Sequence, residues 1–252
     1  MVWKLDDQAP GYPPIESFLP ATVTTPAFDV GVPMMAADSV WGGAEFIFAK
    51  ANGTIPLRAL CQLLPVWNST NRNFDWNATV CPNTTLMGRP VGVCMAESGD
   101  AVNALVVNQW GWFMLTGLTP VNGTATVAAD TAIGITAAGQ IGALTASKQI
   151  VNARCVTPAT QTVVTASVLG LSGANTIQIA NTDGWFVGAY ASGTGVGASA
   201  IVKAIDRTGN ILTVSVNNSA AVTGNVTATY NNATIFYNVV QLNRSFAQGA
   251  IT

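Results

Sequence analysis

The chain has 252 residues, of which 9% are charged and 49% hydrophobic, with a net charge of −2 and no histidine. This length suffices for one large β domain or two smaller ones, each with its own core. The lack of basic clusters argues against nucleic-acid binding. The lack of histidine removes the commonest general base and transition-metal ligand.

Residues 1–38 contain six prolines, so we expect an extended N-terminal arm in which neither a helix nor a regular strand runs far. The arm is also apolar enough to lie on another surface, either its own domain or a neighbouring subunit. The anchors that we expect there are aromatic: Trp3, Tyr12, Phe18 and Phe28. The first residues show no basic stretch followed by an apolar one, so no signal peptide is expected and synthesis in a cytosol is the simplest interpretation.

From residue 39 onward, short β-branched and aromatic runs alternate with Gly and Asn turns, which is typical of barrels and sandwiches. The runs 44–50 and 54–64 flank Asn52-Gly53 and predict a hairpin, and the Asn- and Trp-rich stretch 65–87 predicts a loop. Further strands are expected at 89–96, 102–108, 110–116, 124–129, 132–136, 150–156, 162–169, 176–180, 185–191, 200–205, 211–216, 226–230 and 235–242.

These runs predict an all-β fold with little helix, because no stretch shows a sustained helical apolar stripe. We divide the chain into the arm, a β-barrel or β-sandwich domain at 39–158 and a second β-rich module at 159–231. The final segment, 232–252, is expected to return and complete the first domain, because Val239–Arg244 has the pattern of one more barrel strand.

Trp110 and Trp112 are two positions apart in a predicted strand, so their side chains face the same side and form one aromatic ledge. The ledge is interpreted either as core packing or as an exposed platform for a subunit or a sugar.

The four cysteines form no Cys-x-x-Cys pair. Cys61, Cys94 and Cys155 lie in apolar alternating runs and are expected to be buried and reduced, whereas Cys81 precedes Pro82 in an Asn-rich segment that predicts exposure. Gly193–Ala198 matches a dinucleotide fingerprint, but a β-branched run rather than a helix follows, so we interpret it as a turn. We therefore expect no cofactor, no metal and no catalytic residue.

Several stretches resemble a family, the small-barrel decoration or cement proteins that tailed bacteriophages encode beside the major capsid protein. They are Ala44–Ala51 with Ile55–Leu57, Gly88–Cys94 and Trp110–Gly117. The resemblance covers roughly residues 40–157. The later stretch Gly184–Val196 with Ala200–Ile205 is similar to a β module that recurs in phage tail, fibre and capsid-surface proteins.

This resemblance implies a non-enzymatic virion protein on the outer capsid surface that binds the major capsid protein and itself, as a homotrimer or homodimer. Independently of the resemblance, the scattered Lys and Arg residues and the Gly-, Asn-, Ser- and Thr-rich character of the uncharged runs indicate no nucleic-acid and no membrane partner. An alternative is a tail or fibre component that binds host glycans. A third is a carbohydrate hydrolase using two carboxylates, with candidates Glu45, Glu97, Asp100, Asp130, Asp183 and Asp206.

Overall fold

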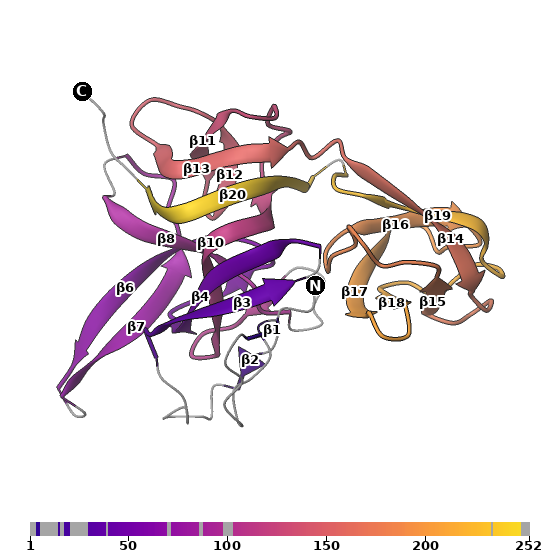
Figure 1. The fold of residues 1–252 in the computed structure, drawn as a ribbon, viewed down its shortest axis with the longest axis horizontal. Coiled ribbons are helices and arrows are strands. Elements are labelled where there is room, and N and C mark those ends of the chain that lie inside the picture. The colour runs from indigo at the N-terminus through magenta and orange to yellow at the C-terminus, as the bar shows by residue number, and fades with distance from the viewer. Residues whose placement is uncertain are drawn as a thin grey trace.

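The computed structural model describes residues 4–5, 15, 18–20, 30–38, 40–69, 72–85, 88–97, 103–232 and 234–247. These residues form twenty β-strands and no helix, so the all-β prediction is confirmed. They are arranged as two β units that lie side by side, with the chain crossing from one to the other twice (Figure 1).

The first unit is built on a twelve-stranded sheet with the order β1-β3-β4-β7-β6-β8-β20-β13-β11-β12-β10-β2, and β5 and β9 form a separate pair. Its strands are β1 (Lys4–Leu5), β2 (Phe18–Leu19), β3 (Pro33–Asp38), β4 (Gly42–Ala51), β5 (Ile55–Pro56), β6 (Leu60–Asn68), β7 (Asn73–Val80), β8 (Arg89–Cys94), β9 (Asn103–Leu105), β10 (Trp110–Gly123), β11 (Ala132–Ala137), β12 (Gln140–Ala143), β13 (Gln149–Thr157) and β20 (Phe236–Ala247).

The long strand β10 lies at the centre of this unit. Its first half pairs with β4 on one edge and with β8 on the other, and its second half pairs with β20. These pairings close the sheet on itself, since β4, β7, β6, β8 and β10 form a ring. Trp112, Phe113 and Met114 are fully buried as a result.

The second unit is a closed barrel with the order β14-β15-β18-β17-β16-β19. Its strands are β14 (Thr162–Leu169), β15 (Thr176–Ile179), β16 (Tyr190–Thr194), β17 (Ala200–Asp206), β18 (Ile211–Val214) and β19 (Thr223–Thr229). After β19 the chain returns to the first unit, where β20 pairs with β10, β13 and β8. The Gly-rich motif at 193–198 ends β16 and leads into strand β17.

Several local predictions are wrong. No strand forms over 124–129, and within 185–191 only Tyr190 and Ala191 are strand residues, at the start of β16. The expected hairpin at Asn52-Gly53 does not form, because β7 lies between β4 and β6 and pairs with both. The expected loop at 65–87 contains the outer half of β6 and all of β7, joined as a regular hairpin. Proline has no backbone amide hydrogen to donate to a neighbouring strand. Pro65 is nevertheless tolerated inside β6, because on the edge of β6 that faces β8 only Leu60–Gln62 are paired and no hydrogen bond is lost there.

The described parts of the arm lie on the chain's own first unit. β1 pairs with β3, and β2 pairs with the start of β10. Ile15 is 0% exposed and belongs to the core. The arm also ends in a regular strand, because β3 runs for six residues along β4, contrary to the expectation of irregular backbone up to residue 38.

Candidate interaction surfaces

The structure describes only one of the four expected arm anchors, and that one only in part. Trp3, Tyr12 and Phe28 lie outside the described residues, and for Phe18 the backbone alone is described, paired with Gly111.

The aromatic ledge is part of the core. Trp110 and Trp112 are 3% and 0% exposed, so the prediction of an exposed platform at these residues is wrong and the core-packing alternative holds. Both rings pack on Phe48, at centroid distances of 6.1 Å for Trp110 and 5.0 Å for Trp112. The physical reason is that β10 closes a ring of strands with β4, β7, β6 and β8, and both side chains belong to the hydrophobic core of that unit.

The candidate carboxylates each have a local role in the described structure. Three of them form ion pairs: Glu45 with Arg244, Glu97 with Arg58, and Asp130 with Arg154. Two accept local hydrogen bonds: Asp183 from Asn181, and Asp206 from the amides of Thr208 and Gly209. Asp100 lies outside the described residues.

All four cysteines are free and buried, including Cys81, for which exposure was expected. Cys81 is held inside by backbone hydrogen bonds, since its amide donates to Leu60 and its carbonyl accepts from Gly139. Burial raises the pKa of every thiol above the usual 9.0, to about 12 for Cys81 and Cys94 and about 11 for Cys155.

Among the described residues, no three His, Cys, Asp or Glu side chains gather as metal ligands, and no helix could cross a membrane.

The β6–β7 hairpin forms a ribbon that extends beyond the other strands of the first unit (Figure 1). Near its tip, Trp67 and Phe74 are direct cross-strand neighbours whose ring centroids lie 5.3 Å apart in an edge-to-face arrangement. They are 55% and 58% exposed, which is unusual for two large aromatic side chains in contact. The sequence analysis does not predict this pair, because both residues fall in the stretch expected to be a loop. The apolar residues Leu63, Pro65 and Trp67 nevertheless occupy alternate positions, as in a strand.

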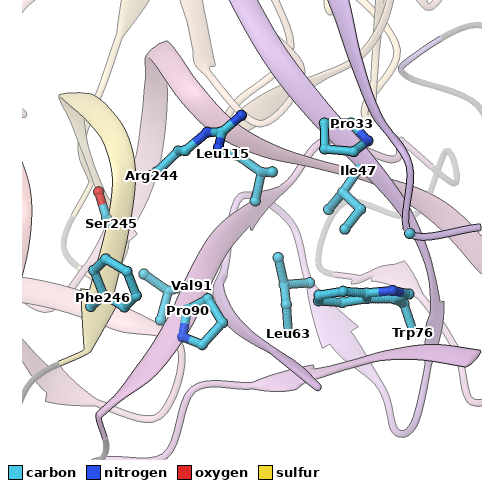
Figure 2. Close-up of a pocket in the computed structure, with 11 residues that line it drawn as sticks. Pro33, Ile47, Leu63, Trp76, Pro90, Val91, Leu115, Arg244, Ser245 and Phe246 are labelled. Carbon is cyan, nitrogen blue, oxygen red and sulfur yellow. The ribbon is translucent and has the colours of Figure 1, made fainter. Parts of the chain in front are cut away.

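An apolar groove of about 230 Å³ lies at the base of this ribbon (Figure 2). Its described lining comprises Gly31, Pro33, Ile47, Leu63, Trp76, Pro90, Val91, Leu115, Arg244, Ser245 and Phe246. Arg244 is the one charged member of that lining, and its guanidinium binds Glu45 at 2.9 and 2.5 Å. The charge at the rim is therefore already compensated, and the floor is free to accept an apolar group.

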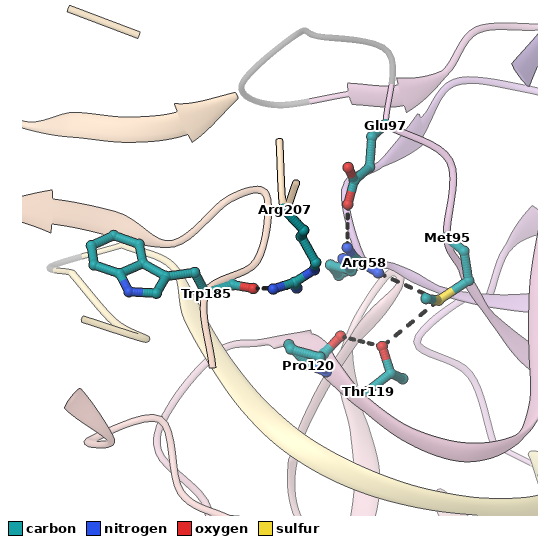
Figure 3. A network of polar contacts seen from close by, with 7 residues as sticks. All are labelled: Arg58, Met95, Glu97, Thr119, Pro120, Trp185 and Arg207. Carbon is teal, nitrogen blue, oxygen red and sulfur yellow. Dashed lines mark hydrogen bonds and ion pairs between the residues drawn. The ribbon is translucent and has the colours of Figure 1, made fainter. Parts of the chain in front are cut away.

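A polar network lies at the joint between the two units (Figure 3). Arg58, which is almost fully buried, donates to Met95 and forms an ion pair with Glu97. From the second unit, Arg207 donates to the carbonyls of Thr182 and Trp185, at 2.7 and 3.1 Å. Burial raises the pKa of Glu97, although the two guanidiniums lower it.

A second exposed apolar surface follows strand β14 of the barrel. Its outward side chains, Val164 and Val168, continue into Leu169 and Leu171, and all four are more than half exposed. Such a row is a candidate contact surface for another macromolecule.

No family model matches this chain. No curated protein matches it either, and no solved structure does.

Proposed function

We propose that this chain is a non-enzymatic structural protein of a tailed-phage virion, which decorates and reinforces the capsid by binding the major capsid protein. One observation carries the proposal. Three of the stretches that resemble decoration proteins, Ala44–Ala51, Gly88–Cys94 and Trp110–Gly117, are separate in the sequence but lie on the adjacent strands β4, β8 and β10, whereas Ile55–Leu57 falls on β5 in a separate pair.

The contacts among these stretches are direct. In β10, Phe113 pairs with Ile47 of β4 on one edge and with Cys94 of β8 on the other. Met114 continues the same pattern with Phe46 and Val93. The resemblance therefore follows one packed substructure rather than scattered segments, which supports its interpretation as a shared barrel.

The surface supports the proposal in a second way. Only 9% of the residues are charged, and two separate apolar surfaces, on the β6–β7 ribbon and along β14, are exposed in the single chain. A protein that functions inside a large assembly has such surfaces covered by neighbours, and it has few charges to desolvate when they meet.

A glycan-binding tail or fibre protein is the second candidate. The observation that favours it is the exposed pair Trp67 and Phe74, because aromatic faces that remain accessible can stack on sugar rings.

The test is co-sedimentation of the purified full chain with expanded capsids that lack it. We expect saturable retention with a fixed number of copies per capsid, unchanged by free monosaccharides and oligosaccharides. Retention that sugars compete away, or binding to host cells but not to capsids, would favour the glycan-binding alternative and contradict the proposal.

A further inference from the structure

We propose that the β6–β7 ribbon is a self-association surface, through which two copies of the chain pair about a twofold axis. In this pair, the Trp67–Phe74 tip of each copy lies in the apolar groove of the other. The inference concerns the chain alone and does not depend on capsid binding.

The groove and the tip lie on the same side of the ribbon. In β6, Leu63 and Trp67 are four positions apart, so their side chains face the same way. Their cross-strand partners are Ala78 and Phe74, and Trp76 lies between these on the same side. At about 3.3 Å per residue, the tip lies roughly 13 Å beyond the part of the groove that Leu63 lines.

The groove matches an aromatic side chain in size and chemistry. An engineered apolar cavity of about 150 Å³ holds a benzene molecule, so about 230 Å³ can hold the larger ring of a tryptophan. One wall is the ring of Trp76, which packs tightly over Gly31. Arg244 at the rim is bound to Glu45, so entry of an indole leaves no new unpaired charge.

The ribbon cannot place its tip in its own groove, because Leu63, Trp67, Phe74 and Trp76 belong to one regular ladder. Beyond Leu64 and before Asn77, the described strands of this ribbon pair only with each other. A two-stranded ribbon with free edges is marginally stable in water, so it gains from a partner that covers its face.

A second copy is the occupant that satisfies both features at once. Because tip and groove share one side and are offset along the ribbon, a twofold rotation places each tip over the opposite groove. Both contacts then form in a single closed pairing, which is the property of an isologous interface. Buried aromatic residues at the centre of an interface contribute most of the binding energy, so Trp67 and Phe74 are the expected hot spots.

The experiment measures the solution mass of the full chain over a concentration series by light scattering. We expect the wild type to form a species of twice 26.0 kDa. The tip variant Trp67→Ser/Phe74→Ser and the groove variant Phe246→Glu should each raise the dissociation constant at least about 30-fold. Matched controls are Leu144→Ser and Leu144→Glu, which change a residue of similar exposure, at 49%, outside the ribbon, the groove lining and the β14 surface, and should leave the mass unchanged.

Mixing the tip and groove variants supplies a test that misfolding cannot imitate. A mixed pair retains one intact tip-in-groove contact, whereas a pair of either variant alone retains none. We therefore expect the mixture to form more dimer than either variant by itself. A monomeric wild type at about 100 µM, a dimer unaffected by the tip variant, or a mixture that behaves as the sum of its parts would overturn the proposal. A monomeric wild type whose tip variant also loses capsid retention would assign the ribbon to the capsid instead.

Discussion

Asn238 is the residue whose replacement should most clearly test how the two β units are joined. Its fully buried side chain accepts hydrogen bonds from the amides of Val127 and Ala159, at 2.9 and 3.0 Å, and donates to the carbonyl of Ala125 at 3.0 Å. Ala159 begins the crossing into the second unit, and Asn238 lies just after the return, in β20. One amide group thus fixes both crossings to the first unit.

The expected cost of Asn238→Ala follows from what it leaves unpaired. Val127 and Ala159 are buried, so their two amides lose their partners without gaining water, at about 1–3 kcal/mol each. Ala125 is exposed, and water can satisfy its carbonyl at little cost. The free energy of unfolding should therefore fall by about 2–6 kcal/mol.

The assay is urea unfolding of wild type and variant, together with hydrogen exchange at Val127 and Ala159. Asn243→Ala, at an exposed position of the same strand, is the control and should change the unfolding free energy by less than about 0.5 kcal/mol. An Asn238→Ala variant within about 1 kcal/mol of wild type, with exchange at both amides unchanged, would refute this account of the joint.

Further predictions concern the arm, the thiols and the carboxylate of Glu97. Ile15→Ala should lower the unfolding free energy by about 2–5 kcal/mol, measured by denaturant unfolding, because the side chain is fully buried. An unchanged unfolding midpoint would show that the arm does not contribute to the core. All four cysteines should resist alkylation at pH 8 in the native chain and react in urea, since burial raises the pKa of Cys81 and Cys94 to about 12; rapid native labelling would contradict this. Burial raises the pKa of Glu97, so the folded chain holds a proton that the unfolded chain has lost, and stability should fall as the pH rises from 4.5 through the raised pKa. In a pH series of unfolding free energies, Glu97→Gln should lack this decline, and parallel curves for wild type and variant would show that Glu97 does not cause it.

Alternation of apolar and polar residues predicts much of the strand content, but not which side of each strand is buried. Trp110 and Trp112 were correctly placed on one side of a strand. Whether that side meets solvent depends on the ring that β10 closes with strands from distant parts of the sequence, which places it in the core. Period-two patterning carries no information about such partners.

Local composition gives a wrong prediction where long-range pairing supplies the structure. Asn-rich sequence and Pro65 predicted a loop, yet β6 and β7 pair without interruption from Cys61↔Val80 to Asn68↔Asn73. The exposed pair Trp67 and Phe74 becomes visible only in that register. Cys81 was likewise placed outside because its neighbours are polar, whereas hydrogen bonds to Leu60 and Gly139 hold it inside.

A cryo-EM map of the intact virion tests the central claim most directly. The account predicts density for the two β units at regular positions on the outer surface of the capsid lattice, with the first unit, which carries the resemblance, in contact with the major capsid protein. Density for this chain only at the tail or its fibres, or its absence from the particle, would contradict the claim.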